Sequence, residues 1–239
     1  MTVQIFIPCF VDQLYPETGF NMVKVLEKLG CTVQYNPAQT CCGQPAFNAG
    51  FRDECRAVAA KFVQDFSGAD YIIAPSASCS GFVRNYYASL FDNSSLHYEV
   101  KRLQTRIFEF SEFITGVLDA TEVGAEMFAK ATYHDSCAAL RECGIKEAPR
   151  RLLNAVKGLE LVEMQDNETC CGFGGTFAVK FESISISMAD QKVNNALASG
   201  AEYIISTDLS CLMHLDGYIK TKGCHLKTMH IADVLAHGW

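Results

Sequence analysis

Cysteine is the residue type whose spacing in this chain points most directly to chemistry. Two segments, TCCGQPAF at 40–47 and TCCGFGGTF at 169–177, share a Thr-Cys-Cys-Gly start. Before each segment an apolar run ends in a cysteine, and after each segment a second apolar run ends in another. The first frame has 31 and 36 intervening residues, and the second has 32 and 39. The repeated cysteines are Cys9, Cys41, Cys42 and Cys79 in the first half, and Cys137, Cys170, Cys171 and Cys211 in the second.

Four thiolates suit either a tetrahedral zinc ion or an iron-sulfur cluster, and the spacing alone does not decide between them. Adjacent cysteines in an extended strand point to opposite faces, so a Cys-Cys pair that serves one site needs a turn. Gly43 and Gly172 directly follow the two pairs and permit such a turn. A multi-atom cluster tolerates the remaining spread better than a single ion. A third interpretation, a thiol or disulfide reductase, needs free reactive thiolates, which metal-bound cysteines are not.

The other cysteines have no counterparts in the opposite half, and we expect them to serve packing; they are Cys31, Cys55, Cys143 and Cys224. His134 lies three residues before Cys137, but Phe6 occupies the equivalent place in the first half. We therefore expect His134 to pack or to support the ligands rather than to bind metal. The CGFGG segment at 171–175 lacks the lysine of a P-loop, so we expect its glycines to let backbone amides approach sulfur.

The elements that must position these cysteines alternate between strands and helices. Residues 20–29 have apolar positions at helical spacing and stop at Gly30, and residues 31–35 alternate like a strand. In the second half, residues 148–156 predict a helix and residues 159–164 a strand. Both halves close alike, with a strand running into a helix at 105–114 and 226–235. We predict an α/β fold of two pseudo-repeated domains, 1–120 and 121–239, each a mostly parallel sheet flanked by helices.

In such sheets, ligands collect at the carboxyl ends of the strands, because the loops there converge. Each repeated cysteine follows a predicted strand, so four thiols from three loops are expected to meet at one rim of each half. The two halves should superimpose with Cys9 on Cys137, Cys41 on Cys170 and Cys79 on Cys211, related by an approximate two-fold axis.

Composition excludes several classes of partner. The chain is 49% hydrophobic and 20% charged with a formal charge of -7, and it has no basic block for a nucleic acid. Its longest uncharged stretch, residues 29–51, is too rich in Gln, Asn, Pro and Gly to insert directly into a membrane. The first residues lack a positively charged region and a cleavage site, so we expect a cytoplasmic chain with reduced cysteines. Any membrane association would come through partners.

The twin frame resembles the cysteine-rich CCG domain found in heterodisulfide reductases and in the iron-sulfur proteins of glycolate and anaerobic glycerol-3-phosphate oxidases. Within that family, a two-domain chain without ferredoxin repeats is similar to the iron-sulfur subunit of complexes that oxidise L-lactate. The resemblance covers essentially the whole chain, and TCCGFGGTF with the closing MHIADVL carries it.

The resemblance implies an electron-transfer subunit with one [4Fe-4S] cluster per domain, bound by the eight repeated cysteines, and companion redox subunits of a lactate-oxidising complex. Zinc in one or both sites, in a structural scaffold subunit, remains the alternative. The fullest family pattern ends each repeat in Cys-x-x-Cys, whereas Ser76 and Asp208 stand at the first of those positions here. The five ligands per site that the noncubane double cluster of heterodisulfide reductase requires are therefore not available among the cysteines.

Overall fold

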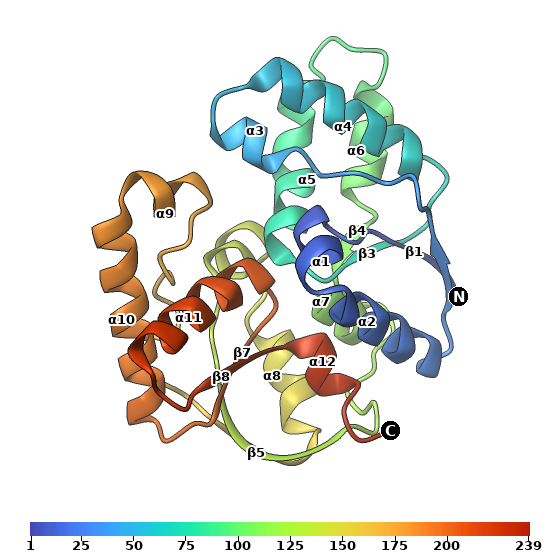
Figure 1. The fold of residues 1–239 in the computed structure, drawn as a ribbon. Helices are drawn as coiled ribbons and strands as arrows, with labels where there is room; N and C mark the ends of the chain where they lie inside the picture. Colours follow the sequence, from blue (N-terminus) through green and yellow to red (C-terminus); the bar gives the residue numbers. More distant parts are fainter.

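The fold is that of a computed structural model, which describes residues 1–239. It contains two sheets, and all strand pairs in both are parallel. The strand order is β2-β1-β3-β4 in the first half and β6-β5-β7-β8 in the second, so the two halves share one topology. Figure 1 shows helices on both faces of each sheet. The predicted α/β architecture of two parallel sheets flanked by helices is confirmed.

The first half comprises β1 (Thr2–Ile5), α1 (Cys9–Leu14), α2 (Pro16–Lys28), β2 (Thr32–Tyr35), α3 (Gln44–Asn48), α4 (Arg52–Phe66), β3 (Ile72–Ala74), α5 (Ala77–Leu90), α6 (His97–Gln104), β4 (Ile107–Glu109) and α7 (Phe110–Gly116). The second half comprises β5 (Glu126–Tyr133), the π-helical turn η1 (Ala139–Cys143), α8 (Glu147–Asn154), β6 (Lys157–Val162), α9 (Thr176–Lys180), α10 (Glu182–Ala198), β7 (Tyr203–Ser206), α11 (Leu209–Lys222), β8 (Lys227–His230) and α12 (Ile231–Leu235). The predicted boundary at residues 120 and 121 falls in the connection between α7 and β5. None of the helices is both long and apolar enough to cross a bilayer.

Local sequence explains the element ends that matter for the site. Proline at the first position of α2 has no N–H to leave unpaired, and the chain leaves that helix through Gly30 at φ +83°. Glu109 caps α7 through a capping box, and His230 caps α12 at the equivalent place in the second half. Both strand-to-helix junctions are therefore built in the same way with different side chains.

The two halves pack against each other reciprocally. Helix α2 of the first half lies against α12 of the second, and α8, the counterpart of α2, lies against α7, the counterpart of α12 (Figure 1). Thr18 and Asn21 on α2 donate hydrogen bonds to Asp233 on α12, at 2.9 and 3.0 Å. The larger apolar core contains residues from both halves, including Leu26, Phe113 and Leu235. Such paired contacts between equivalent elements are what an approximate two-fold axis produces.

Candidate metal centres at the two sheet rims

The strand order places the cysteine loops at the point where each sheet reverses its direction of winding. In the first half, β1 and β3 are neighbours at the centre of the sheet, and their carboxyl ends lead to Cys9 and Cys79. Strands β5 and β7 lead in the same way to Cys137 and Cys211. The crevice between such central strands is the usual ligand site of open parallel sheets.

The first four cysteines, which we name the first quartet, form a continuous string of sulfur atoms. They are Cys9, Cys41, Cys42 and Cys79. The Sγ atoms of Cys42 and Cys79 lie 3.5 Å apart. The thiols of Cys9 and Cys42 lie close enough to that of Cys41 to shift its pKa. All four predicted side chains of this half are therefore brought together.

The second quartet, Cys137, Cys170, Cys171 and Cys211, repeats this arrangement. The thiols of Cys137 and Cys171 lie close enough to that of Cys170 to shift its pKa, and the sulfurs of Cys171 and Cys211 lie within 4.8 Å of each other. The second quartet is the more enclosed of the two. Cys211 is 8% exposed and Cys171 1% exposed, whereas Cys9 of the first quartet is exposed.

The expected turn after each Cys-Cys pair is present. Gly43 has φ +89° and Gly172 has φ +96°, and their backbone N–H groups donate to Cys41 Sγ at 3.3 Å and Cys170 Sγ at 3.4 Å. These φ values favour glycine. A Cβ atom on Gly172 would also lie 2.6 Å from the carbonyl oxygen of Ser185. The turn that aims both cysteines at one rim therefore depends on glycine at this position.

Electrostatics within each quartet favour a bound cation. Hydrogen bonds from neighbouring thiols lower the pKa of Cys41 and of Cys170. The pKa of Cys9 is raised by the interaction with Cys41 and by burial. The pKa of Cys171 is raised by the interactions with Cys170 and Cys211 and by burial. One thiolate per quartet is thus stabilised, and further thiolates are disfavoured as long as no positive charge lies between them. A soft metal cation supplies that charge, because it binds cysteine in the thiolate form.

The other four cysteines join neither quartet. Cys31 and Cys55 are buried in the two apolar cores, although the Cys55 sulfur lies close behind the turn at Gly43. Cys143 donates to the carbonyl oxygen of Ala77 at 3.4 Å, and Cys224 lies 3.9 Å from that of Ile219.

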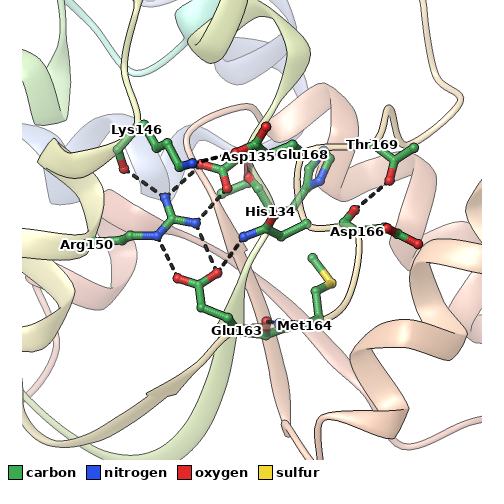
Figure 2. A network of polar contacts seen from close by, with 12 residues as sticks. His134, Asp135, Lys146, Arg150, Glu163, Met164, Asp166, Glu168 and Thr169 are labelled. Atoms are coloured by element: carbon green, nitrogen blue, oxygen red, sulfur yellow. Dashed lines mark hydrogen bonds and ion pairs between the residues drawn. The ribbon is translucent and has the colours of Figure 1, made fainter.

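An ion-pair network holds the segment that leads to Cys137. Figure 2 shows the Arg150 guanidinium between two carboxylates. Its Nη atoms donate to both oxygens of Asp135 at 2.8 and 2.6 Å, and its Nε donates to Glu163 at 2.6 Å. Asp135 is fully buried, so Arg150 neutralises a charge that would otherwise be unpaired in the interior. This anchor has no repeated motif that could have revealed it in the sequence.

The two residues that depart from the family's Cys-x-x-Cys pattern contact each other across the two halves. Asp208 Oδ1 accepts from the Ser76 hydroxyl and from the Ser78 backbone N–H, both at 3.1 Å. Its Oδ2 accepts from the Ser136 hydroxyl at 2.5 Å. Asp208 therefore ties together the loops that carry Cys79, Cys137 and Cys211. A contact between equivalent positions is what the predicted two-fold relation of the halves would produce.

His134 is much closer to the second quartet than its sequence position alone indicated. Its ring is fully buried, neither ring nitrogen makes a hydrogen bond of normal geometry, and the backbone of Asn167 lies beside the ring. Burial lowers the pKa of His134 to about 3, so the imidazole is neutral. One of its nitrogens and the sulfurs of Cys171 and Cys211 all lie within 4.8 Å of one another. In the sequence, the one indication of this role was that a histidine stands in the second frame where Phe6 stands in the first.

Comparison with known proteins shows which family this chain belongs to. The family model described as a cysteine-rich CCG domain matches the chain twice, at residues 3–84 and 131–216. Lactate utilization protein A 1 of Bacillus mycoides is 44% identical over 237 residues, covering 98% of this chain and 96% of that protein. Lactate utilization protein A of Geobacillus kaustophilus is 42% identical over 235 residues, covering 98% of each.

Among solved structures, a hypothetical protein from Helicobacter pylori has the same fold, with a TM-score of 0.66 at 12% identity. The similarity covers 98% of this chain and 48% of that one, so the chain spans about half the length of the solved structure. Both domain matches contain a complete cysteine frame, and the curated relatives align from end to end. The chain therefore belongs to the family of cysteine-rich CCG-domain proteins that includes lactate utilization protein A.

Proposed function

We propose that this protein transfers electrons in lactate utilization and that each quartet holds one [4Fe-4S] cluster. The relatives named lactate utilization protein A support the process. The two soft, all-sulfur donor sets at equivalent rims support the cofactor. Such clusters, when bound, accept and release one electron at a time.

The observation that carries this proposal is that the structure gathers four thiols at each of two equivalent rims. A single zinc ion binds sulfur at about 2.3 Å, which keeps all of its sulfur ligands within about 4.6 Å of one another. The one set of three donor atoms within 4.8 Å of one another contains two of the quartet sulfurs, those of Cys171 and Cys211, together with a nitrogen of His134. A cluster with several metal corners does not require its four cysteines to surround one point.

The contact between the two halves supports a relay through both sites. Ser76 is three residues before Cys79, and Asp208 is three residues before Cys211. Their hydrogen bond holds the two rims in a fixed relation. The chain's own side chains thus join a loop of the first quartet to a loop of the second.

Partners follow from the chemistry of lactate. Oxidation of a 2-hydroxy acid to a 2-oxo acid removes two electrons and requires a two-electron acceptor such as a flavin. We propose that companion redox proteins of a lactate-oxidising complex supply that acceptor and dock over the rims. The complex would be cytoplasmic, with any membrane contact made by the companions.

The experiment compares electron uptake with turnover. Protein purified without oxygen should bleach when a strong one-electron reductant is added, and it should not oxidise lactate with artificial acceptors until companions are added. Cys42→Ser and Cys171→Ser should each remove about half of the bleaching, while Cys55→Ser, a buried cysteine outside the quartets, should leave it unchanged. Lactate oxidation by the isolated chain at the rate of the whole complex would contradict the relay function.

A zinc-bound scaffold is the second candidate, and it is favoured by the compact set of His134, Cys171 and Cys211 in the second half. Three donors within 4.8 Å resemble a single-ion site more than either quartet does. A colourless protein that contains zinc and no sulfide would support this candidate.

A further inference from the structure

His134 is the least satisfied polar side chain near either rim. Its ring is fully buried, neither nitrogen makes a hydrogen bond of normal geometry, the backbone of Asn167 lies beside the ring, and one nitrogen is within 4.8 Å of the sulfurs of Cys171 and Cys211. Burying an imidazole with neither nitrogen bonded is unfavourable, since water would have satisfied both. An imidazole nitrogen beside two cysteine sulfurs also matches the mixed sulfur and nitrogen ligand sets of protein metal sites.

In the first half, the position equivalent to His134 serves packing alone. Phe6 occupies it there, and its ring meets the edge of Phe62 on α4 with centroids 4.8 Å apart. Phe62 lies seven residues after Cys55, which packs against the turn at Gly43. Ser185 packs against the turn at Gly172 in the same way, and the seventh residue after it is Lys192. Histidine and lysine therefore replace an aromatic pair beneath the second rim.

Lys192 holds the loop that closes over His134. The lysine is 1% exposed, and its Nζ donates to the carbonyl oxygens of Asp166 at 2.5 Å and Asn167 at 3.0 Å. That loop continues into Cys170 and Cys171. On the other side, Asp135, the residue after His134, is fixed by Arg150 (Figure 2). The segments on both sides of the His134 imidazole are thus fixed, one by Lys192 and the other by Arg150, and the ring lies beside the sulfurs of Cys171 and Cys211.

We propose that His134 is a direct nitrogen ligand of the metal centre in the second half, where it and three of the four cysteines fill the four terminal ligand positions, so that this centre is a mixed sulfur and nitrogen site while the first is all sulfur. The inference rests on the proposed function only in requiring a bound metal centre, and it applies to an iron-sulfur cluster or to a single zinc ion. It also gives the two repeats different chemistry, because Phe6 offers no donor atom in the first half.

The test is pulsed electron paramagnetic resonance on protein purified without oxygen and reduced by one electron per cluster. Cells are grown with ¹⁵N-labelled histidine, so a coupling from an imidazole ligand is distinguished from that of backbone amides near sulfur. The wild type should show a ¹⁵N coupling of the size expected for a coordinated imidazole, and His134→Phe should lack it. Phe6→Leu, the matched change in the first half, should retain it.

His134→Phe is a suitable variant because phenylalanine fills the same place in the first half. The labelled wild type also decides the question without any variant. Reduced clusters in both halves with no histidine coupling would overturn the proposal, and so would a coupling that survives in His134→Phe.

If the protein contains zinc instead of iron, the iron-sulfur function fails while the ligand role of His134 can still be tested. Zinc-edge X-ray absorption should then show imidazole scattering that His134→Phe removes, and its absence from the wild type would overturn the ligand assignment. Protein that binds neither metal would overturn both.

Discussion

Replacing Asp208 should weaken the contact between the two halves more than any change to a surface carboxylate. Its side chain is 1% exposed and accepts three hydrogen bonds, from the Ser76 hydroxyl, the Ser78 backbone N–H and the Ser136 hydroxyl. Hydrogen bonds to a charged group contribute about 1.5 to 3 kcal/mol each. The two hydroxyls can rotate towards other acceptors, but the Ser78 N–H cannot. We therefore expect Asp208→Ala to lower the free energy of unfolding by about 3 to 5 kcal/mol.

Asp208→Asn provides the graded comparison. The amide keeps an oxygen for two of the donors and turns its NH₂ group towards a hydroxyl that can accept, so the expected loss is only about 1 to 2 kcal/mol. Trp239, the single tryptophan, stacks on Lys28 of the other half with the ammonium 3.8 Å from the ring centroid. Its fluorescence during denaturant unfolding therefore reports on the contact between the halves.

The control is Asp70→Ala, which removes an 83% exposed carboxylate that lies 3.9 Å from Arg106 and should change stability by less than about 0.5 kcal/mol. Loss of less than about 1 kcal/mol in Asp208→Ala, or equal losses in the alanine and asparagine variants, would refute the reasoning that Asp208 joins the halves through these three bonds.

Three further predictions concern the supports of the sites. Arg150→Met leaves the buried carboxylate of Asp135 unpaired and should cost about 3 to 5 kcal/mol in denaturant unfolding at neutral pH. Gly172→Ala forces a Cβ atom to 2.6 Å from the Ser185 oxygen at φ +96°, so metal content should fall by about one site's worth, measured by elemental analysis. Burial raises the pKa of the Glu109 carboxyl from 4.5 to about 8. Between these two pH values the folded state keeps a proton that the unfolded state has lost. The free energy of unfolding should therefore fall as the pH rises from about 4.5 to 8. Glu109→Gln should flatten that decline in a series of unfolding curves.

Each of these has a matched control. Lys146→Met removes only an exposed partner of Glu168 and should change stability by less than about 0.5 kcal/mol, so an equal loss in Arg150→Met would contradict the buried-pair argument. Gly200→Ala has positive φ but no atom closer than 3.7 Å to the new Cβ, and it should leave metal content unchanged. An undiminished pH slope in Glu109→Gln would show that other groups produce it.

Repetition within the sequence made the architecture and the location of the sites predictable. The Thr-Cys-Cys-Gly segments and the flanking cysteines recur in order, and the turn needs glycine, so both quartets and their glycines could be placed without coordinates. Parallel sheets follow from strands that alternate with helices. The ligand role of the eight cysteines stays a prediction that metal analysis must test.

Features that occur once could not be found in this way. His134 was expected to pack or to support the ligands, because a single histidine beside an apolar run gives no indication that both nitrogens will be left without partners. Lys192 and Arg150 act across 15 to 26 residues of chain, on partners chosen by loop packing rather than by spacing. The pairing of Ser76 with Asp208 depends on how the halves face each other, and no local pattern specifies that orientation.

The most direct test of the central claim is the content of iron, acid-labile sulfide and zinc in protein purified and analysed without oxygen. Two [4Fe-4S] clusters predict about eight iron and about eight sulfide per chain, falling to about four of each in Cys42→Ser or Cys171→Ser. One or two zinc ions per chain with no sulfide would contradict the proposal that the quartets hold iron-sulfur clusters.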